Sequence, residues 1–140
     1  MGRRIIPDVI GQQQQLLQLS GLSTVREAVR RMHHRDVGAV LITSAGRLEG
    51  IFTERDLLAR VVAQDRHPDL TRLCDVMTSN PDTIEADESA VTALGLMNEH
   101  GYRHLPVMRD GQLVGIVSRQ DFIGEEIQEV EDRLGHAQTF

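Results

Sequence analysis

The feature that most constrains the fold is an internal repeat, in which residues 24–58 can be laid on residues 89–123 without a gap. The offset is constant at 65 positions, the separation of Asp56 from Asp121. The same offset pairs further identical residues: Ala28 with Ala93, Met32 with Met97, Gly46 with Gly111, Leu48 with Leu113, Gly50 with Gly115 and Ile51 with Ile116. The chain of 140 residues, the size of one compact domain, is therefore predicted to contain two copies of one unit.

Each copy passes through the same order of hydrophobic patterns. Helical spacing comes first, in Val25, Ala28, Val29 and Met32 and again in Ala90, Ala93, Leu94 and Met97. Thr24 is expected to cap the first of these helices and Asp87 the second. Two apolar runs around a glycine turn then predict a β-hairpin, at residues 37–42 and 48–52 and again at 105–108 and 113–117. A second helix follows, with an apolar face formed by Leu57, Leu58, Val61 and Val62 in copy one and by Phe122, Ile123, Ile127 and Val130 in copy two.

The two copies are expected to form one folded body, with the first at residues 1–66 and the second at residues 67–140. One such unit has too little core, so the apolar faces of the copies should pack against each other and leave a cleft at their interface. A short lead-in precedes each copy, at residues 6–10 and 73–77. The first copy has two extra residues in or near Gln12 to Gln15, which we interpret as a polar loop or an extra helical turn.

Composition excludes several kinds of partner. Acidic residues outnumber basic ones and give a formal net charge of -6, which disfavours nucleic acid. Aromatic residues make up 3% of the chain, too few for base-stacking platforms. No apolar run approaches the roughly 20 residues of a membrane helix, and the single cysteine, Cys74, cannot form an internal disulfide. Because the sequence shows no export signal, we expect a cytoplasmic protein without membrane contact.

The sharpest shared feature is a strand followed by a hydroxyl residue and, three positions later, an aspartate. It reads Gly50-Ile51-Phe52-Thr53-Glu54-Arg55-Asp56 in copy one and Gly115-Ile116-Val117-Ser118-Arg119-Gln120-Asp121 in copy two. One interpretation is a capping box, in which hydroxyl and carboxylate satisfy free amides at a helix start. The other is a ligand site, because a helix start favours a phosphate and a carboxylate can accept both hydroxyls of a ribose.

Together with the repeat and the sequence Tyr102-Arg103-His104-Leu105-Pro106-Val107, these motifs resemble a tandem pair of CBS (cystathionine-beta-synthase) domains, or Bateman module. The resemblance covers nearly the whole chain and includes the Met77-Thr78 lead-in and the Asp110-Gly111 turn. It implies an α/β (α+β) fold of two pseudo-symmetric β-α-β-β-α repeats packed together. It also implies a regulatory module that binds AMP, ADP, ATP or a related adenosyl compound between the repeats. Such modules commonly dimerise, and this one would signal to a partner protein in trans.

The resemblance also implies roles for individual residues. Asp56 and Asp121 would hold ribose, with Thr53 and Ser118 near ribose or phosphate. The adenine pockets would be lined by the strand starts Val37, Gly38 and Ala39 and by Tyr102, Arg103 and His104. Ile51 and Ile116 would pack on the base, and Thr83 and Ile84 lie on the matching entry strand of copy two. The candidates for phosphate contact are Arg35, His100, Arg103 and Arg119. The first copy lacks a Met-Thr-x-x-Pro lead-in, so the second copy has the fuller motif.

Other functions remain open. We find no Ser-His-Asp arrangement, P-loop or carboxylate pair with a suitable base, and therefore expect neither an enzyme nor a catalytic cofactor. A metal site would draw on His33 and His34, or on His100 and His104, although Pro106 places His104 at a strand start, away from a shared helix face. A ligand-free adaptor or dimerisation module would use both motif aspartates only as caps. Sensors of NADH or S-adenosylmethionine are further alternatives.

Overall fold

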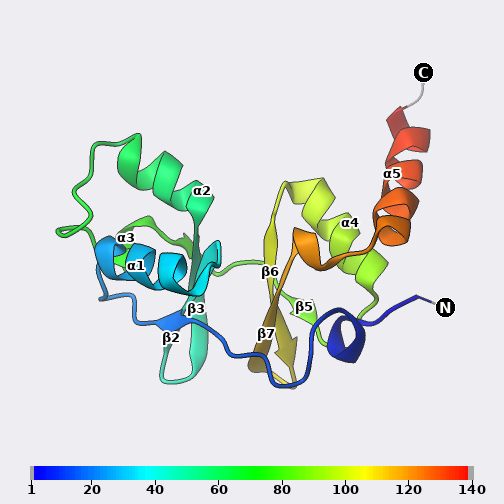
Figure 1. The fold of residues 1–140 in the computed structure, drawn as a ribbon, viewed down its shortest axis with the longest axis horizontal. Coiled ribbons are helices and arrows are strands. Elements are labelled where there is room, and N and C mark those ends of the chain that lie inside the picture. Colours follow the sequence, from blue (N-terminus) through cyan, green and yellow to red (C-terminus); the bar gives the residue numbers. More distant parts are fainter. Residues whose placement is uncertain (1, 139–140) are drawn as a thin grey trace. The chain divides into compact units, whose positions relative to one another are not determined.

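The protein consists of two compact units, which the computed structural model describes for the backbone of residues 2–138 and the side chains of residues 2–133 (Figure 1). The central unit is Gln15–Pro81, and the C-terminal unit combines Met1–Gln14 with Asp82–Phe140. Each unit joins one small sheet to helices, which confirms the predicted α+β fold.

The bounds of these units differ from the repeats that we placed at residues 1–66 and 67–140. Each lead-in belongs to the unit formed by the other copy. The side chains of Ile5 and Ile10 are buried in the hydrophobic cluster of the C-terminal unit, and that of Leu73 is buried in the cluster of the central unit. The repeats are therefore units of sequence. In the folded protein, the lead-in of each copy packs in the unit formed by the other copy.

The central unit contains the helix and hairpin predicted for copy one. Its elements are β1 (Gln18–Leu19), α1 (Val25–Arg35), β2 (Ala39–Ser44), β3 (Arg47–Thr53), α2 (Glu54–Asp56), η2 (Leu57–Val62), α3 (Leu73–Val76) and β4 (Thr78–Ser79). The sheet order is β1-β2-β3-β4, with β1 parallel to β2 and the other pairs antiparallel. Thr24 caps α1 as predicted, since its hydroxyl accepts a hydrogen bond from the backbone N–H of Glu27 at 3.2 Å. Ala45 and Gly46, both at positive φ, form the tight turn between β2 and β3.

The C-terminal unit contains the elements predicted for copy two. They are η1 (Ile5–Val9), β5 (Ile84–Glu85), α4 (Ala90–His100), β6 (His104–Arg109), β7 (Gln112–Ser118), η3 (Arg119–Asp121) and α5 (Gly124–Gln138). The sheet order is β5-β6-β7, with β5 parallel to β6 and β7 antiparallel to it. The expectation that Asp87 caps α4 is wrong. The cap is Ser89, whose hydroxyl accepts from the backbone N–H of Thr92 at 3.1 Å, because the helix begins only at Ala90.

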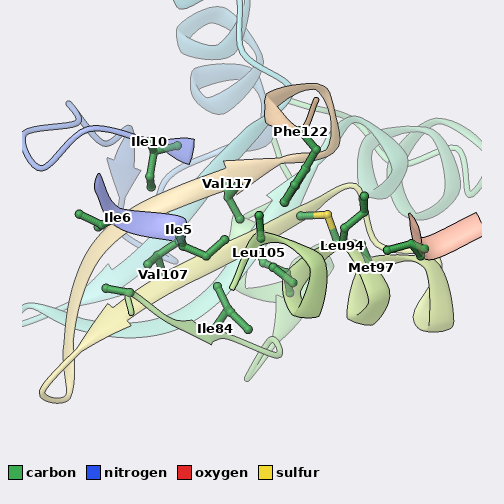
Figure 2. Close-up of a cluster of buried hydrophobic side chains, with 14 residues drawn as sticks. Ile5, Ile6, Ile10, Ile84, Leu94, Met97, Leu105, Val107, Val117 and Phe122 are labelled. Carbon is green, nitrogen blue, oxygen red and sulfur yellow. The ribbon is translucent and has the colours of Figure 1, made fainter. Parts of the chain in front are cut away.

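Each unit has its own aliphatic core. Figure 2 shows the cluster of the C-terminal unit, where side chains from η1, α4, β6 and β7 meet around Leu105 and Val117. In the central unit, Val61 is fully buried, but Leu58 and Val62 are 66% and 59% exposed. Their predicted place on the apolar face is therefore wrong, because only a narrow stripe of this helix packs on the core.

The motif glycines Gly50 and Gly115 make room for the exchanged lead-ins. A Cβ on Gly50 would lie 2.5 Å from Sδ of Met77 and 2.9 Å from the carbonyl oxygen of Thr78. A Cβ on Gly115 would lie 2.7 Å from Cδ1 of Ile10 and 3.0 Å from Oε1 of Gln14. Glycine is required at Gly50, because the backbone carbonyl of Thr78 passes directly over the strand, whereas the atoms facing Gly115 are the ends of side chains, which can shift.

Arg3 ties the N-terminal segment to the start of α5. Its Nε and Nη2 donate to the two carboxylate oxygens of Glu126, at 3.0 and 2.8 Å. The Glu126 side chain is 7% exposed and also accepts from the backbone N–H of Ile123 at 3.0 Å. The hydrogen bond from Arg3, with a smaller contribution from that N–H, holds the pKa of Glu126 below its ordinary value.

Replacing Glu126 with glutamine is expected to lower the free energy of unfolding by about 1–2 kcal/mol at pH 7, because charge-assisted hydrogen bonds are lost. A depressed folded-state pKa stabilises the protein above the unfolded-state pKa of about 4.3, and this contribution disappears as the pH falls through the folded-state pKa. Urea unfolding of both proteins between pH 7 and 3 should give stabilities that converge at the acidic end. Glu129→Gln, in an exposed pair with Arg133, is the control and should change little. A constant difference for Glu126→Gln across this range would contradict the prediction.

Candidate functional site

Both copies of the hydroxyl-and-aspartate motif form a capping box at the end of a hairpin strand. In the central unit, the backbone N–H and the hydroxyl of Thr53 donate to Oδ2 of Asp56, at 3.0 and 3.1 Å. In the C-terminal unit, the same groups of Ser118 donate to Oδ2 of Asp121, at 2.7 and 3.1 Å. The capping interpretation is therefore confirmed in both copies, and each box uses one carboxylate oxygen.

The start of the preceding strand lies beside each motif. Ala39 pairs with Thr53, and His104 pairs with Ser118. The next residues are joined as well, because the backbone N–H of Glu54 donates to the carbonyl of Gly38 at 3.1 Å and that of Arg119 donates to the carbonyl of Arg103 at 2.9 Å. The sheet thus brings together the predicted strand-start residues and the predicted ribose-binding residues within each unit.

The predicted base-contacting residues share one face of each sheet. Successive side chains of a strand point to opposite faces. In the central unit, the hydrophobic cluster takes Val40, Ile42 and Phe52, so Ala39 and Ile51 lie on the other face together with Thr53. In the C-terminal unit, the cluster takes Leu105, Val107 and Val117, which leaves His104, Ile116 and Ser118 on the other face. The site residues of each unit therefore lie on the sheet face opposite its hydrophobic cluster, where Ala39 and Ile51 of the central unit are only 7% and 6% exposed.

The two aspartates differ in their remaining contacts. Asp56 is 6% exposed, and its Oδ1 accepts from the hydroxyl of Thr78 at 3.2 Å and forms an ion pair with Nε of Arg60 at 3.5 Å. Asp121 is partly exposed, and no hydrogen bond or ion pair among the described side chains reaches its Oδ1. Within the described part of the chain, both carboxylate oxygens of Asp56 have side-chain partners, whereas only Oδ2 of Asp121 does.

Thr78 and Gln14 are site residues that the sequence reasoning missed. Thr78 pairs with Ile51 across β3 and β4. Ile116, the repeat counterpart of Ile51, is bound by the side chain of Gln14, whose Nε2 donates to its carbonyl at 3.0 Å and whose Oε1 accepts from its N–H at 2.8 Å. One side-chain amide thus takes the place of a paired strand. The two extra residues near Gln12 to Gln15 were the available signal, but they gave no indication of the partner.

Tyr102 and His100 form a stacked pair in the C-terminal unit, beside Asp82. Their ring centroids lie 5.2 Å apart with an interplanar angle of 18°. The Tyr102 hydroxyl donates to Oδ2 of Asp82 at 2.5 Å, and this hydrogen bond raises the pKa of Tyr102 above its ordinary value. Thr83 is exposed, whereas Ile84 is 7% exposed and belongs to the hydrophobic cluster of the unit. Ile84 is therefore a core residue here.

The predicted phosphate-binding cations lie in different places. Arg103 and Arg119 are both exposed and adjacent, through the backbone hydrogen bond between them. The side chain of Arg35 is bound to its own unit, because its Nη2 donates to the carbonyl of Gln15 at 2.7 Å. Val37, predicted to line a base pocket, is 39% exposed, and its N–H donates to the carbonyl of Met32. Of the predicted phosphate-binding residues, Arg119 stands nearest a motif aspartate along the chain, just before Gln120 and Asp121.

Among the described residues, no three His, Cys, Asp or Glu side chains are grouped as a metal site would require. None of the described helices is long and apolar enough to cross a membrane.

Comparison with known proteins identifies the class. The family described as CBS domain matches residues 14–63 and 73–127, so the chain belongs to the CBS domain family and contains a tandem pair. The "CBS domain-containing protein CBSCBSPB2" of Arabidopsis thaliana is 37% identical over 110 residues, which are 78% of this chain and 20% of that protein. This chain thus spans about a fifth of that relative's length. The "Uncharacterized protein YlbB" of Bacillus subtilis (strain 168) is 35% identical over 118 residues, 83% of this chain and 78% of that protein.

Two similar solved structures contain ligands. A CBS domain protein from Pyrobaculum aerophilum complexed with AMP has a TM-score of 0.80 and 26% identity, and the match covers 93% of this chain and 99% of that one. The Hypoxic Response Protein I with two coordinated zinc ions has a TM-score of 0.68 and 26% identity, over 81% of this chain and 91% of that one. Tandem CBS domains form a regulatory class of module, and at least one protein of this fold holds a nucleotide.

Proposed function

We propose that this CBS pair is a regulatory module that binds an adenosine nucleotide, AMP or ATP, and signals to a partner protein in trans. The observation that carries the proposal is the Asp121 carboxylate, whose Oδ2 is bound by Ser118 while Oδ1 has no hydrogen-bond partner among the described side chains. The AMP complex of the Pyrobaculum aerophilum protein supports the choice of ligand. A carboxylate accepts both hydroxyls of a ribose, so this group is suited to a nucleoside.

The surroundings of Asp121 supply the other parts of a nucleotide site. Ile116 lies two residues before Ser118 on the same face of β7 and would pack on the base. Tyr102 and His104 would line the base pocket from the start of β6. Arg103 and Arg119, whose backbones are hydrogen-bonded to each other, would face the phosphate, where their two positive charges would offset the overall charge of -6.

The central unit would offer a second, related site. Asp56 and Thr53 would take the ribose, and Ile51 and Ala39 would contact the base from the sheet face opposite the hydrophobic cluster. Gly38 would approach the base through its backbone. Because the carboxylate of Asp56 is already engaged, this site is the weaker candidate.

The bound nucleotide would act as an effector, without a catalytic role or a catalytic cofactor. It would favour one arrangement of a cytoplasmic homodimer over another, and the partner would read the difference. A ligand can shift such an equilibrium only by the difference in its affinity for the two states. Binding of the partner and binding of the nucleotide must therefore depend on the same conformational change.

Thermal unfolding with a panel of ligands tests the proposed function. AMP, ADP, ATP, NADH, S-adenosylmethionine and zinc chloride are each added at rising concentration. A ligand that binds only the folded state stabilises it by about 2.7 kcal/mol at 100 times its Kd. AMP or ATP should raise the unfolding temperature with increasing concentration. No shift with any adenosine compound would favour a ligand-free adaptor, and a shift with zinc alone would favour a metal sensor.

A further inference from the structure

Asp56 carries contacts that copy those of a bound ribose. A ribose presents two neighbouring O–H groups to a carboxylate. Here Oδ1 of Asp56 accepts the O–H of Thr78 at 3.2 Å and lies 3.5 Å from Nε of Arg60. A hydroxyl and a cationic N–H from the chain itself thus occupy the oxygen that a nucleoside would use.

The repeat offers an internal comparison, because the C-terminal unit lacks both contacts. The residue 65 positions after Arg60 is Glu125, which cannot pair with a carboxylate. The counterpart of Thr78 on the strand edge is Gln14, whose amide is bound to the backbone of Ile116 instead. The two aspartates therefore form the same kind of capping box, but only Asp56 has the additional contacts with Thr78 and Arg60.

We propose that Thr78 and Arg60 act as internal ligands that keep the Asp56 site closed. This inference rests on the proposed function and specifies how the two sites are used. Nucleotide binds first at Asp121, where Oδ1 is open, and it binds at Asp56 only by displacing Thr78 and Arg60. A buried carboxylate without partners is costly, so the Asp56 carboxylate keeps Thr78 and Arg60 until a ligand replaces them. A nucleotide gains affinity at this site only when these residues have released the carboxylate.

The same contacts connect the Asp56 site to the segment that leads into the next unit. Thr78 is the first residue of β4, and Nη1 of Arg60 donates to the carbonyl of Met77 at 2.8 Å. The central unit ends at Pro81, just after β4. Displacement of Thr78 and Arg60 thus removes two side-chain ties from the start of this segment, and nucleotide at Asp56 is coupled to its release.

Calorimetric titration with AMP tests the inference in the intact chain. The wild type is expected to bind one equivalent per chain. Asp121→Ala removes the open site and should leave only weak binding at the closed Asp56 site. Adding Thr78→Val and Arg60→Gln to Asp121→Ala should restore one equivalent, with an affinity at least tenfold above that of Asp121→Ala alone, or about 1.4 kcal/mol. The matched control adds Ser79→Ala and Arg55→Gln, two exposed neighbours, and should restore nothing.

Circular dichroism and thermal unfolding verify that each variant is folded. The inference is overturned if the wild type binds two equivalents of equal affinity, or if the folded triple variant binds no better than Asp121→Ala. Equal gains in the control variant would overturn it as well. A wild type that binds none of the adenosine nucleotides would overturn the proposed function, and the inference with it.

Discussion

Replacing Asp121 with alanine is expected to weaken AMP or ATP binding at least 100-fold while the protein stays folded. The carboxylate would accept two ribose hydroxyls, and each hydrogen bond to a charged group contributes about 1.5–3 kcal/mol. The cost to folding is small, about 1 kcal/mol, because the side chain is partly exposed and its described partner is the cap residue Ser118. Calorimetric titration gives the affinity, and urea unfolding gives the stability.

Gln120→Ala is the matched control for this measurement. Gln120 lies between Ser118 and Asp121, is exposed, and has no hydrogen bond among the described side chains. Its replacement should leave both affinity and stability unchanged. If Asp121→Ala binds the nucleotide as tightly as the wild type, Asp121 is only a helix cap.

Replacing Asp56 with alanine should instead destabilise the fold, by about 3 kcal/mol. Asp56 is buried and holds Thr53, Thr78 and Arg60, so its removal leaves the backbone N–H of Thr53 and the hydroxyl of Thr78 without acceptors. Buried polar groups that lose a partner cost about 1–3 kcal/mol each. Urea unfolding of Asp56→Ala and Asp121→Ala, at one pH, compares the two repeat counterparts directly.

Asp56→Asn refines this comparison. An asparagine has one acceptor oxygen, so it can keep Thr53 or Thr78 but loses the ion pair with Arg60. Its stability should fall between those of the wild type and the alanine variant. Equal losses for Asp56→Ala and Asp121→Ala would show that the extra contacts of Asp56 contribute nothing.

The sequence was sufficient to predict the helices and the hairpin of each repeat. Local signals determine them: the spacing of Ala28 and Met32 indicates a helix, and Gly46 marks a turn. Two local predictions were wrong. Ser89 caps α4 in place of Asp87, since both residues are good caps and only the first helical residue decides between them. Leu58 is exposed, because helical spacing does not define how wide a stripe is covered.

The site could be predicted only in part. The capping boxes at Asp56 and Asp121 were recognisable because their residues are three positions apart. Thr78 lies 22 positions from Asp56, and Gln14 lies 102 positions from Ile116. Contacts between residues so far apart in the sequence depend on which unit each lead-in joins. Neither the composition nor the hydrophobic periodicity of the sequence carries that information. The roles of the remaining site residues toward a nucleotide stay predictions.

The exchange of lead-ins also determines how the chain can be divided. A fragment cut at the repeat bound, residues 1–66, would keep Ile5 and Ile10, which belong to the other core, and would lose Leu73 and β4, which belong to its own. The two repeats are thus not separable as gene segments, although they are copies of each other. Duplication of the repeat and exchange of the lead-ins together make each half dependent on sequence that lies outside it.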